Sequence, residues 1–462
     1  MRSPRVFLLF RAIRVLPSAA VAWLLLASML ALVPDGAQAI PLFTSQVGVP
    51  CQSCHAGGGF PELTPFGRDF KLRGYTLGSR KGLPLGGSFI ASVTRTRSTT
   101  GSDPAAFKDN GEVELELAAV YAGGRISDHL GAFAQWNYNG IEHHSGLEMA
   151  DIRYAREFML KGTSVLVGAT LNNSPTVQDV WNTVPMWSFP SRSSPVAVMP
   201  ASSPAIDMTL ASQVAGLGVY TWIDGRYYLE LSAYRTADGP FSVLRAGQPS
   251  STPGGVAALR GYNPYWRFAY ERRWGTQSLE LGTFGLIVNR YPDNTLAIGA
   301  TDRYFDPGVD AQYQYIVGDH AFSAQASYIH ERQTYHASYP MPVGAGPTPA
   351  NSSDTLNVVR LKGSYWWRQR YGATLGLFST LGTADAGLYP AAMGNPAMDS
   401  LSNRPNARGM IFELGYMPIQ NLRLSAQYTY YQRFNGAARN YDGLGRSASA
   451  NDALYMYAQF LY

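Results

Sequence analysis

Hydrophobic and polar residues alternate with a period of two from residue 86 to the end of the chain, in short segments separated by turn residues. The clearest segment, residues 422–430, has Leu, Ala or Tyr at every second position and Arg, Ser, Gln or Thr between them. Segments that begin near Val113, Tyr227 and Phe322 repeat this pattern. Because successive side chains of a strand point to opposite faces, each segment is predicted to be a β-strand with one apolar and one polar face.

The number and spacing of these segments predict an all-β fold, a 16-stranded antiparallel transmembrane β-barrel of the porin type. Short turns such as Ser127-Asp128 and Lys161-Gly162 alternate with long loops, the largest near 172–211, 236–262, 334–354 and 384–407. Within lipid a sheet must close, since every backbone N–H and C=O needs a partner in the protein. The strands of a soluble β-sandwich or propeller also alternate between apolar and polar residues. Such a fold does not explain why short turns alternate with long loops along the chain. The predicted strands start near residues 87, 112, 130, 148, 164, 212, 226, 264, 277, 303, 320, 355, 371, 408, 422 and 449.

The last residues support the same prediction. Leu454, Met456, Ala458, Phe460 and the terminal Tyr462 share one face of the final segment. An aromatic final residue is typical of the closing strand of an outer-membrane barrel, although any buried last strand could show this alternation. With an even number of strands, both termini are expected on the periplasmic side.

The first 39 residues have the parts of a secretory signal peptide. Four arginines precede an apolar run from 19 to 33, and Ala37-Gln38-Ala39 is a cleavage sequence. The alternative is a retained membrane anchor, for which the run is short. Cleavage leaves 33 basic against 31 acidic residues, so the net charge falls from +5 to +2. We therefore expect no nucleic acid partner, since that would need a clustered basic face.

The amino-acid composition excludes several other classes of protein. Charged residues make up 15% and aromatic residues 13% of the chain, a balance that argues against disorder. Beyond residue 40 no apolar run approaches the ~20 residues of a membrane-spanning helix, so a helical membrane protein is excluded. The two cysteines are too few for a disulfide-stapled secreted fold.

Residues 40–85 do not alternate, and they contain the sequence Cys51-Gln52-Ser53-Cys54-His55. C-x-x-C-H is the attachment motif of a c-type haem, in which two thiols form thioethers and the histidine ligates the iron. The predicted domains are therefore a signal peptide at 1–39, a mono-haem cytochrome c head at 40–85 and a barrel at 86–462. One covalent haem c is expected, held by Cys51, Cys54 and His55. The alternative is a redox-labile disulfide beside an incidental histidine.

The residues around the motif resemble those of the fused outer-membrane cytochrome-porins of iron-oxidising bacteria. The similarity lies in Phe43, Gln46 and Gly48 and in the segment 61–75. It implies a small haem head joined to a sixteen-stranded porin and an association with oxidation of ferrous iron at the cell surface. Thr44-Ser45 and the longer spacer 56–59 depart from the family pattern and leave the haem motif intact.

Further candidate residues surround this motif. Arg68 and Lys71 are candidates to pair with haem propionates, or else are part of a solvated basic strip. The sixth iron ligand is predicted to be absent or water, Lys71 or Lys81, or a residue of the barrel. Inward carboxylates are hard ligands suited to passage of Fe²⁺, or else form an ordinary polar lining. The candidates that alternation places inward are Glu112, Glu114, Glu116, Asp151, Arg153, Glu230, Arg267 and Glu271.

These features together predict an outer-membrane electron conduit. An extracellular donor, Fe(II) by the family resemblance, would reduce the haem, and a periplasmic cytochrome c would accept the electron. The head is expected to pack in the lumen as a plug, because 46 residues are too few for a core of their own. The alternatives are a diffusion porin with a structural or regulatory haem head and a conduit for another donor or acceptor. The proline-rich loop 172–211 is expected to fold inward in either case.

Overall fold

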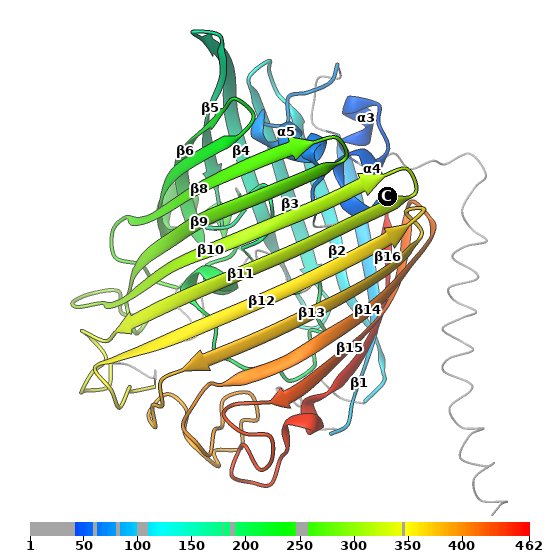
Figure 1. Ribbon diagram of the computed structural model, residues 1–462. Helices are drawn as coiled ribbons and strands as arrows, with labels where there is room; N and C mark the ends of the chain where they lie inside the picture. The colour runs from blue at the N-terminus through cyan, green and yellow to red at the C-terminus, as the bar shows by residue number, and fades with distance from the viewer. Residues whose placement is uncertain are drawn as a thin grey trace, which may run out of the picture. The chain divides into compact units, whose positions relative to one another are not determined.

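A computed structural model describes residues 42–58, 62–79, 84–98, 110–177, 179–184, 189, 191–245, 257–343 and 347–462. Sixteen antiparallel strands form one closed barrel, in which each strand pairs with its neighbours in the chain and β1 pairs with β16 (Figure 1). The strands are β1 (Leu85–Thr96), β2 (Val113–Arg125), β3 (Leu130–Asn139), β4 (His144–Leu160), β5 (Thr163–Asn172), β6 (Val214–Ile223), β7 (Tyr227–Thr236), β8 (Asn263–Trp274), β9 (Gln277–Arg290), β10 (Asp302–Val317), β11 (His320–Thr334), β12 (Ser353–Trp367), β13 (Tyr371–Gly382), β14 (Ala407–Ile419), β15 (Leu422–Arg433) and β16 (Ala453–Leu461).

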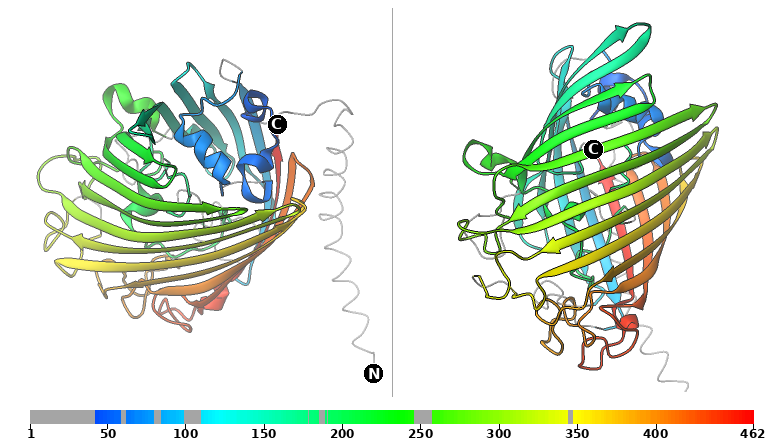
Figure 2. Two further views of the ribbon diagram at one scale, coloured as in Figure 1. Left: turned by 45° about the horizontal axis from the view of Figure 1, so that its top comes forward. Right: turned by 60° about the vertical axis from the view of Figure 1, so that its left-hand side comes forward.

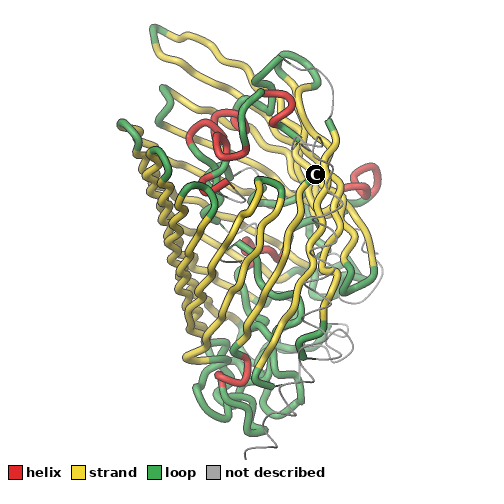
Figure 3. The backbone as a smooth tube through the Cα atoms, turned by 90° about the vertical axis from the view of Figure 1, so that its right-hand side faces the viewer, coloured by secondary structure: helices red, strands yellow, loops and turns green. Residues whose placement is uncertain are grey.

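The predicted barrel and its strand number are confirmed. The first residue predicted from the sequence and the first residue in the structure differ most for β4 and β16. β16 starts at Ala453 because the preceding residues form the short helix η4 (Ala448–Asn451). Short turns lie at one end of the barrel and long loops at the other (Figure 3). Within the described residues, no helix is both long and apolar enough to cross a membrane.

The barrel buries its polar face and exposes its apolar face. On β7, Leu231 is 66% exposed, whereas the adjacent Glu230 is 2% exposed. The partner residues alternate in phase, since Val219 pairs with Leu231 and is also exposed. This arrangement is opposite to that of a soluble sandwich, and it is the one that lipid requires of a spanning barrel.

The described residues before β1 form four short helices inside the ring of strands, at the end with the short turns (Figure 2). They are α3 (Thr44–Val47), α4 (Cys51–Cys54), η1 (Ala56–Gly58) and α5 (Pro65–Leu72). α5 begins where the Thr64 hydroxyl accepts a hydrogen bond from Gly67 N and Pro65 fills the first turn. At this same end Gly87 and the C-terminal Tyr462 exchange backbone hydrogen bonds of 2.8 Å, so β1 begins beside the end of the chain.

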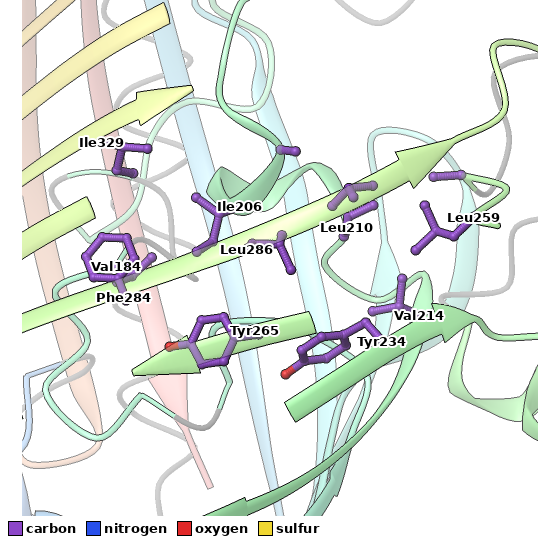
Figure 4. Packing of buried hydrophobic residues seen from close by; sticks show 13 residues of the cluster. Val184, Ile206, Leu210, Val214, Tyr234, Leu259, Tyr265, Phe284, Leu286 and Ile329 are labelled. Atoms are coloured by element: carbon purple, nitrogen blue, oxygen red, sulfur yellow. The ribbon is translucent and has the colours of Figure 1, made fainter. Parts of the chain in front are cut away.

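The described residues of the long loop between β5 and β6 also fold into the barrel, one of the arrangements considered for loop 172–211. Its residues Val184, Ile206 and Leu210 belong to a buried cluster with Phe284 and Leu286 of β9 (Figure 4). The loop includes the single-turn helix η2 (Ala205–Thr209). A second short helix, η3 (Gly239–Leu244), follows β7.

Candidate haem-attachment site

The two thiols stand at the first and last positions of α4. Residues three apart in a helix share one face, which is the geometry that two thioether bonds to one ring require. Both side chains are half-buried free thiols. Burial raises the pKa of Cys54 to about 11 and also raises that of Cys51. Thiols with raised pKa values are less reactive than those of a redox-active disulfide centre.

His55 leaves the helix in an extended conformation, with φ −118° and ψ 130°. Its N–H donates to Cys51 O at 2.9 Å, and the residue forms an antiparallel bridge with Leu63. Burial lowers the pKa of His55 to about 4, and the nearby Glu62 carboxylate opposes this only in part. The imidazole is therefore neutral at physiological pH, which is the form that ligates a metal. Together, the two thiols on one helical face and a neutral imidazole beside them fit covalent attachment of haem.

α5 holds α4 through close backbone packing. Thr64 N donates to Cys54 O at 2.9 Å, and the Thr64 hydroxyl donates to Ser53 O at 2.5 Å. A Cβ at Gly67 would overlap the carbonyl of Cys54, so only glycine allows the two helices to approach this closely.

Arg68 of α5 points into the barrel wall and is buried. Its guanidinium forms an ion pair of 2.8 Å with Glu271 of β8 and also donates to Gln312 and Gln314 of β10. The sequence predicted this residue as a partner of haem propionates. The structure places it against the wall, and pairing with a propionate stays a prediction.

Lys71 lies one turn further along α5 and contacts the inward loop. Its ammonium group donates to the backbone carbonyls of Val177 and Asp179. Burial, together with the nearby Arg153, lowers the pKa of Lys71 to about 8. Its roles toward a propionate or the iron stay predictions, and Lys81 lies outside the described residues.

The inward charged residues pair with one another. Glu116 accepts hydrogen bonds from Arg192 and from Tyr455, and Arg267 lies 2.6 Å from Asp310 and 3.0 Å from Glu280. In the described part of the chain no group of three or more His, Cys, Asp or Glu side chains could hold a metal ion. These contacts support a polar lining over a path of Fe²⁺ ligands. The predicted inward residues that are buried are Glu116, Asp151, Arg153, Glu230, Arg267 and Glu271.

Two residues of β12 reach the head and were not predicted as site residues. Lys362 Nζ lies 2.5 Å from Glu62 Oε1, and the Trp366 ring packs against Gly57. Strand alternation alone places both on the inward face. Nothing local to β12 indicates that this face meets the segment that follows the haem motif.

No family model and no curated protein matches the chain. Among solved structures, it is similar to OmpT of Vibrio cholerae with loop L8 deleted, at 10% identity and a TM-score of 0.45, covering 82% of this chain and 99% of that one. It is similar to OmpF of Salmonella typhi in complex with daunomycin, at 12% identity and a TM-score of 0.47, with coverage of 82% and 97%. An anion-selective porin from Comamonas acidovorans has 12% identity and a TM-score of 0.42, with coverage of 83% and 100%.

Proposed function

We propose that this protein is an outer-membrane electron conduit that carries one covalent haem c on Cys51, Cys54 and His55. The observation that carries this proposal is the position of the attachment motif inside the ring of strands. The apolar outer face supports a position in the outer membrane, and in this proposal the short turns and both chain ends are on the periplasmic side. The donor is extracellular Fe(II), as the family resemblance implies, and the acceptor is a periplasmic cytochrome c.

The contacts of the head with the wall support this function. Arg68 binds β8 and β10, Arg73 binds Glu157 of β4, and Glu62 binds Lys362 of β12. These strands surround the lumen, so the head is fixed across it at the end with the short turns. A protein that must bring one redox centre through an insulating membrane needs such a fixed position.

Each residue of the motif then has a distinct task. Cys51 and Cys54 would hold the haem covalently, and the neutral His55 would bind its iron. The haem supplies the one-electron chemistry when bound, while the protein supplies orientation and electrostatic environment. The activity would be that of an Fe(II):cytochrome c oxidoreductase.

A diffusion porin is the second candidate function, and the strand number favours it. Barrels of sixteen to eighteen strands leave an aqueous channel when nothing fills them. Here the head and the loop between β5 and β6 both lie within the barrel. We favour the conduit because this filling opposes solute flow.

Addition of Fe²⁺ to the purified, oxidised protein tests the proposal. The spectrum of a reduced c-type haem should appear, and a periplasmic cytochrome c should then reoxidise the protein. His55→Ala is the control that should lose this turnover. Absence of covalent haem would overturn the conduit. If the haem is reduced by another donor but not by Fe²⁺, the assignment of iron as the donor is wrong and the conduit itself still stands.

A further inference from the structure

The polypeptide on both sides of the predicted axial histidine contacts one strand of the barrel. Glu62, whose backbone carbonyl accepts from Ala56 N at 2.9 Å, pairs with Lys362 at 2.5 Å. Gly57, two residues after His55, packs against the ring of Trp366. Lys362 and Trp366 are both on the inward face of β12.

These contacts are buried and precise. Lys362 and Trp366 are each 7% exposed, and Glu62 is equally buried. Gly57 has φ +77°, a conformation that favours glycine, and a Cβ there would overlap the indole. The segment can therefore approach the Trp366 ring only because residue 57 lacks a side chain.

Trp366 is itself supported from the wall. The Arg423 guanidinium lies 5.3 Å from the centroid of the Trp366 ring, and it pairs with Glu413 at 2.7 Å. A cation over an indole face stabilises the arrangement, more strongly when water is excluded. The ring is thus held between β15 and the haem-binding segment.

We propose that β12 positions the axial ligand of the haem, with Lys362 and Trp366 as the positioning residues. This inference rests on the proposed function, because it concerns the haem assigned to His55. The orientation of the imidazole then depends on the barrel, and so does the charge near the iron. The barrel would tune the redox potential as well as insulate the electron.

The charge of Lys362 gives the direction of the effect. Lys362→Met removes a buried cation and leaves Glu62 with only the electrostatic influence of Arg423, so the region near the haem becomes more negative. A negative charge favours the oxidised iron, so the midpoint potential should fall. A tenfold change in the ratio of reduced to oxidised protein corresponds to about 59 mV for one electron, and we expect a change of about this size. The double variant Glu62→Gln/Lys362→Met restores neutrality and should return the potential toward that of the wild type.

The test uses the purified full-length holoprotein in detergent, with measurement of covalent haem content, heat-modifiable migration, midpoint potential and the electron paramagnetic resonance spectrum of the oxidised iron. Trp366→Ala should alter the spectrum and the potential. Trp367→Ala is the matched control, because Trp367 is the next residue and points outward. It should change neither quantity.

The inference is overturned if Lys362→Met folds, keeps its haem and has the potential and spectrum of the wild type. If Trp366→Ala does not fold, the variants Lys362→Met and Glu62→Gln/Lys362→Met still test the inference. A wild-type protein that holds haem but is not reduced by Fe²⁺ overturns only the iron assignment, because its potential still reports on β12. A wild-type protein without haem overturns both proposals.

Discussion

Arg68 and Glu271 are 203 residues apart in the chain, and their side chains meet at 2.8 Å with 1% of each exposed. The same carboxylate accepts a hydrogen bond of 2.8 Å from the indole of Trp181 in the inward loop. Glu271 therefore joins three parts of the molecule, which are the head, the wall and the loop. This connection makes the Arg68–Glu271 pair one of the two buried ion pairs that the described residues form between the head and the wall, the other being Glu62–Lys362.

Replacing Arg68 by Met should release the head. Loss of Arg68 leaves the buried Glu271 with Arg273, 2.5 Å away, as its remaining counter-charge. The cost should therefore lie below the about 3–5 kcal/mol of an unpaired buried charge. We expect residues 42–79 to become sensitive to a protease under conditions in which the strands stay resistant. Mass spectrometry of a timed digest would locate the cuts.

Arg73→Met is the matched control for this experiment. Arg73 pairs with Glu157 at 2.7 Å, but both side chains are more than a third exposed. An exposed pair contributes about 0–1 kcal/mol, so the digest should resemble that of the wild type. Equal sensitivity of the two variants would show that the buried pair does not hold the head.

The outward face gives a prediction about the membrane. Leu231 lies in the middle of β7, and Leu231→Arg should cost about 2–4 kcal/mol of folding free energy in lipid vesicles. Tyr227→Arg, at the end of the same strand, should cost only about 0–1 kcal/mol. Urea unfolding in vesicles measures both values. Equal costs at the two depths would contradict the assignment of this face to lipid.

The strands and their faces could be predicted because the period of two is a local property of the sequence. Leu229, Leu231 and Glu230 carry the pattern within three residues, and several other strands repeat it. The turns are equally local, since Asp224 and Gly225 take the left-handed conformations that a tight connection needs.

The pairing of charges inside the barrel could not be predicted in this way. The sequence offers several carboxylates that could pair with Arg68. Only the closed barrel brings Glu271 next to it. The pair between Lys362 and Glu62 is similar, because it joins a strand to a segment far away in the sequence. Such contacts depend on the register of the whole barrel.

The covalent haem gives a direct chemical prediction. Cys51→Ser/Cys54→Ser should abolish haem that survives denaturation, since no thiol remains to form a thioether. The barrel should still show heat-modifiable migration, because both residues lie outside the strands. Haem staining of a denaturing gel after expression with cytochrome c maturation factors is the measurement. A stained band from the double variant would contradict the assignment.

The partly buried Lys71 predicts a pH dependence. Its pKa falls from 10.5 unfolded to about 8 in the folded protein, so the unfolded chain binds the extra proton between these values. Stability should therefore rise with pH across this window, by roughly 3 kcal/mol relative to Lys71→Met. Urea unfolding of both proteins at pH 7.5 and pH 10.5 measures the difference, with Lys161→Met as the control for loss of a lysine from an exposed turn. If the free energies of unfolding of the wild type and Lys71→Met differ by the same amount at both pH values, the prediction is wrong.

Conductance distinguishes the filled barrel from an open porin. If the head obstructs the lumen, as the proposed function requires, the wild type should conduct ions weakly in a planar bilayer. A variant whose signal peptide is joined directly to β1 should conduct several-fold more, and further deletion of the inward loop should increase the current again, since a barrel of this strand number then has an open lumen. Heat-modifiable migration confirms that each barrel has folded before it is measured. A wild-type conductance as large as that of the headless variant would instead identify the diffusion porin as the function, because the head would then not obstruct the lumen.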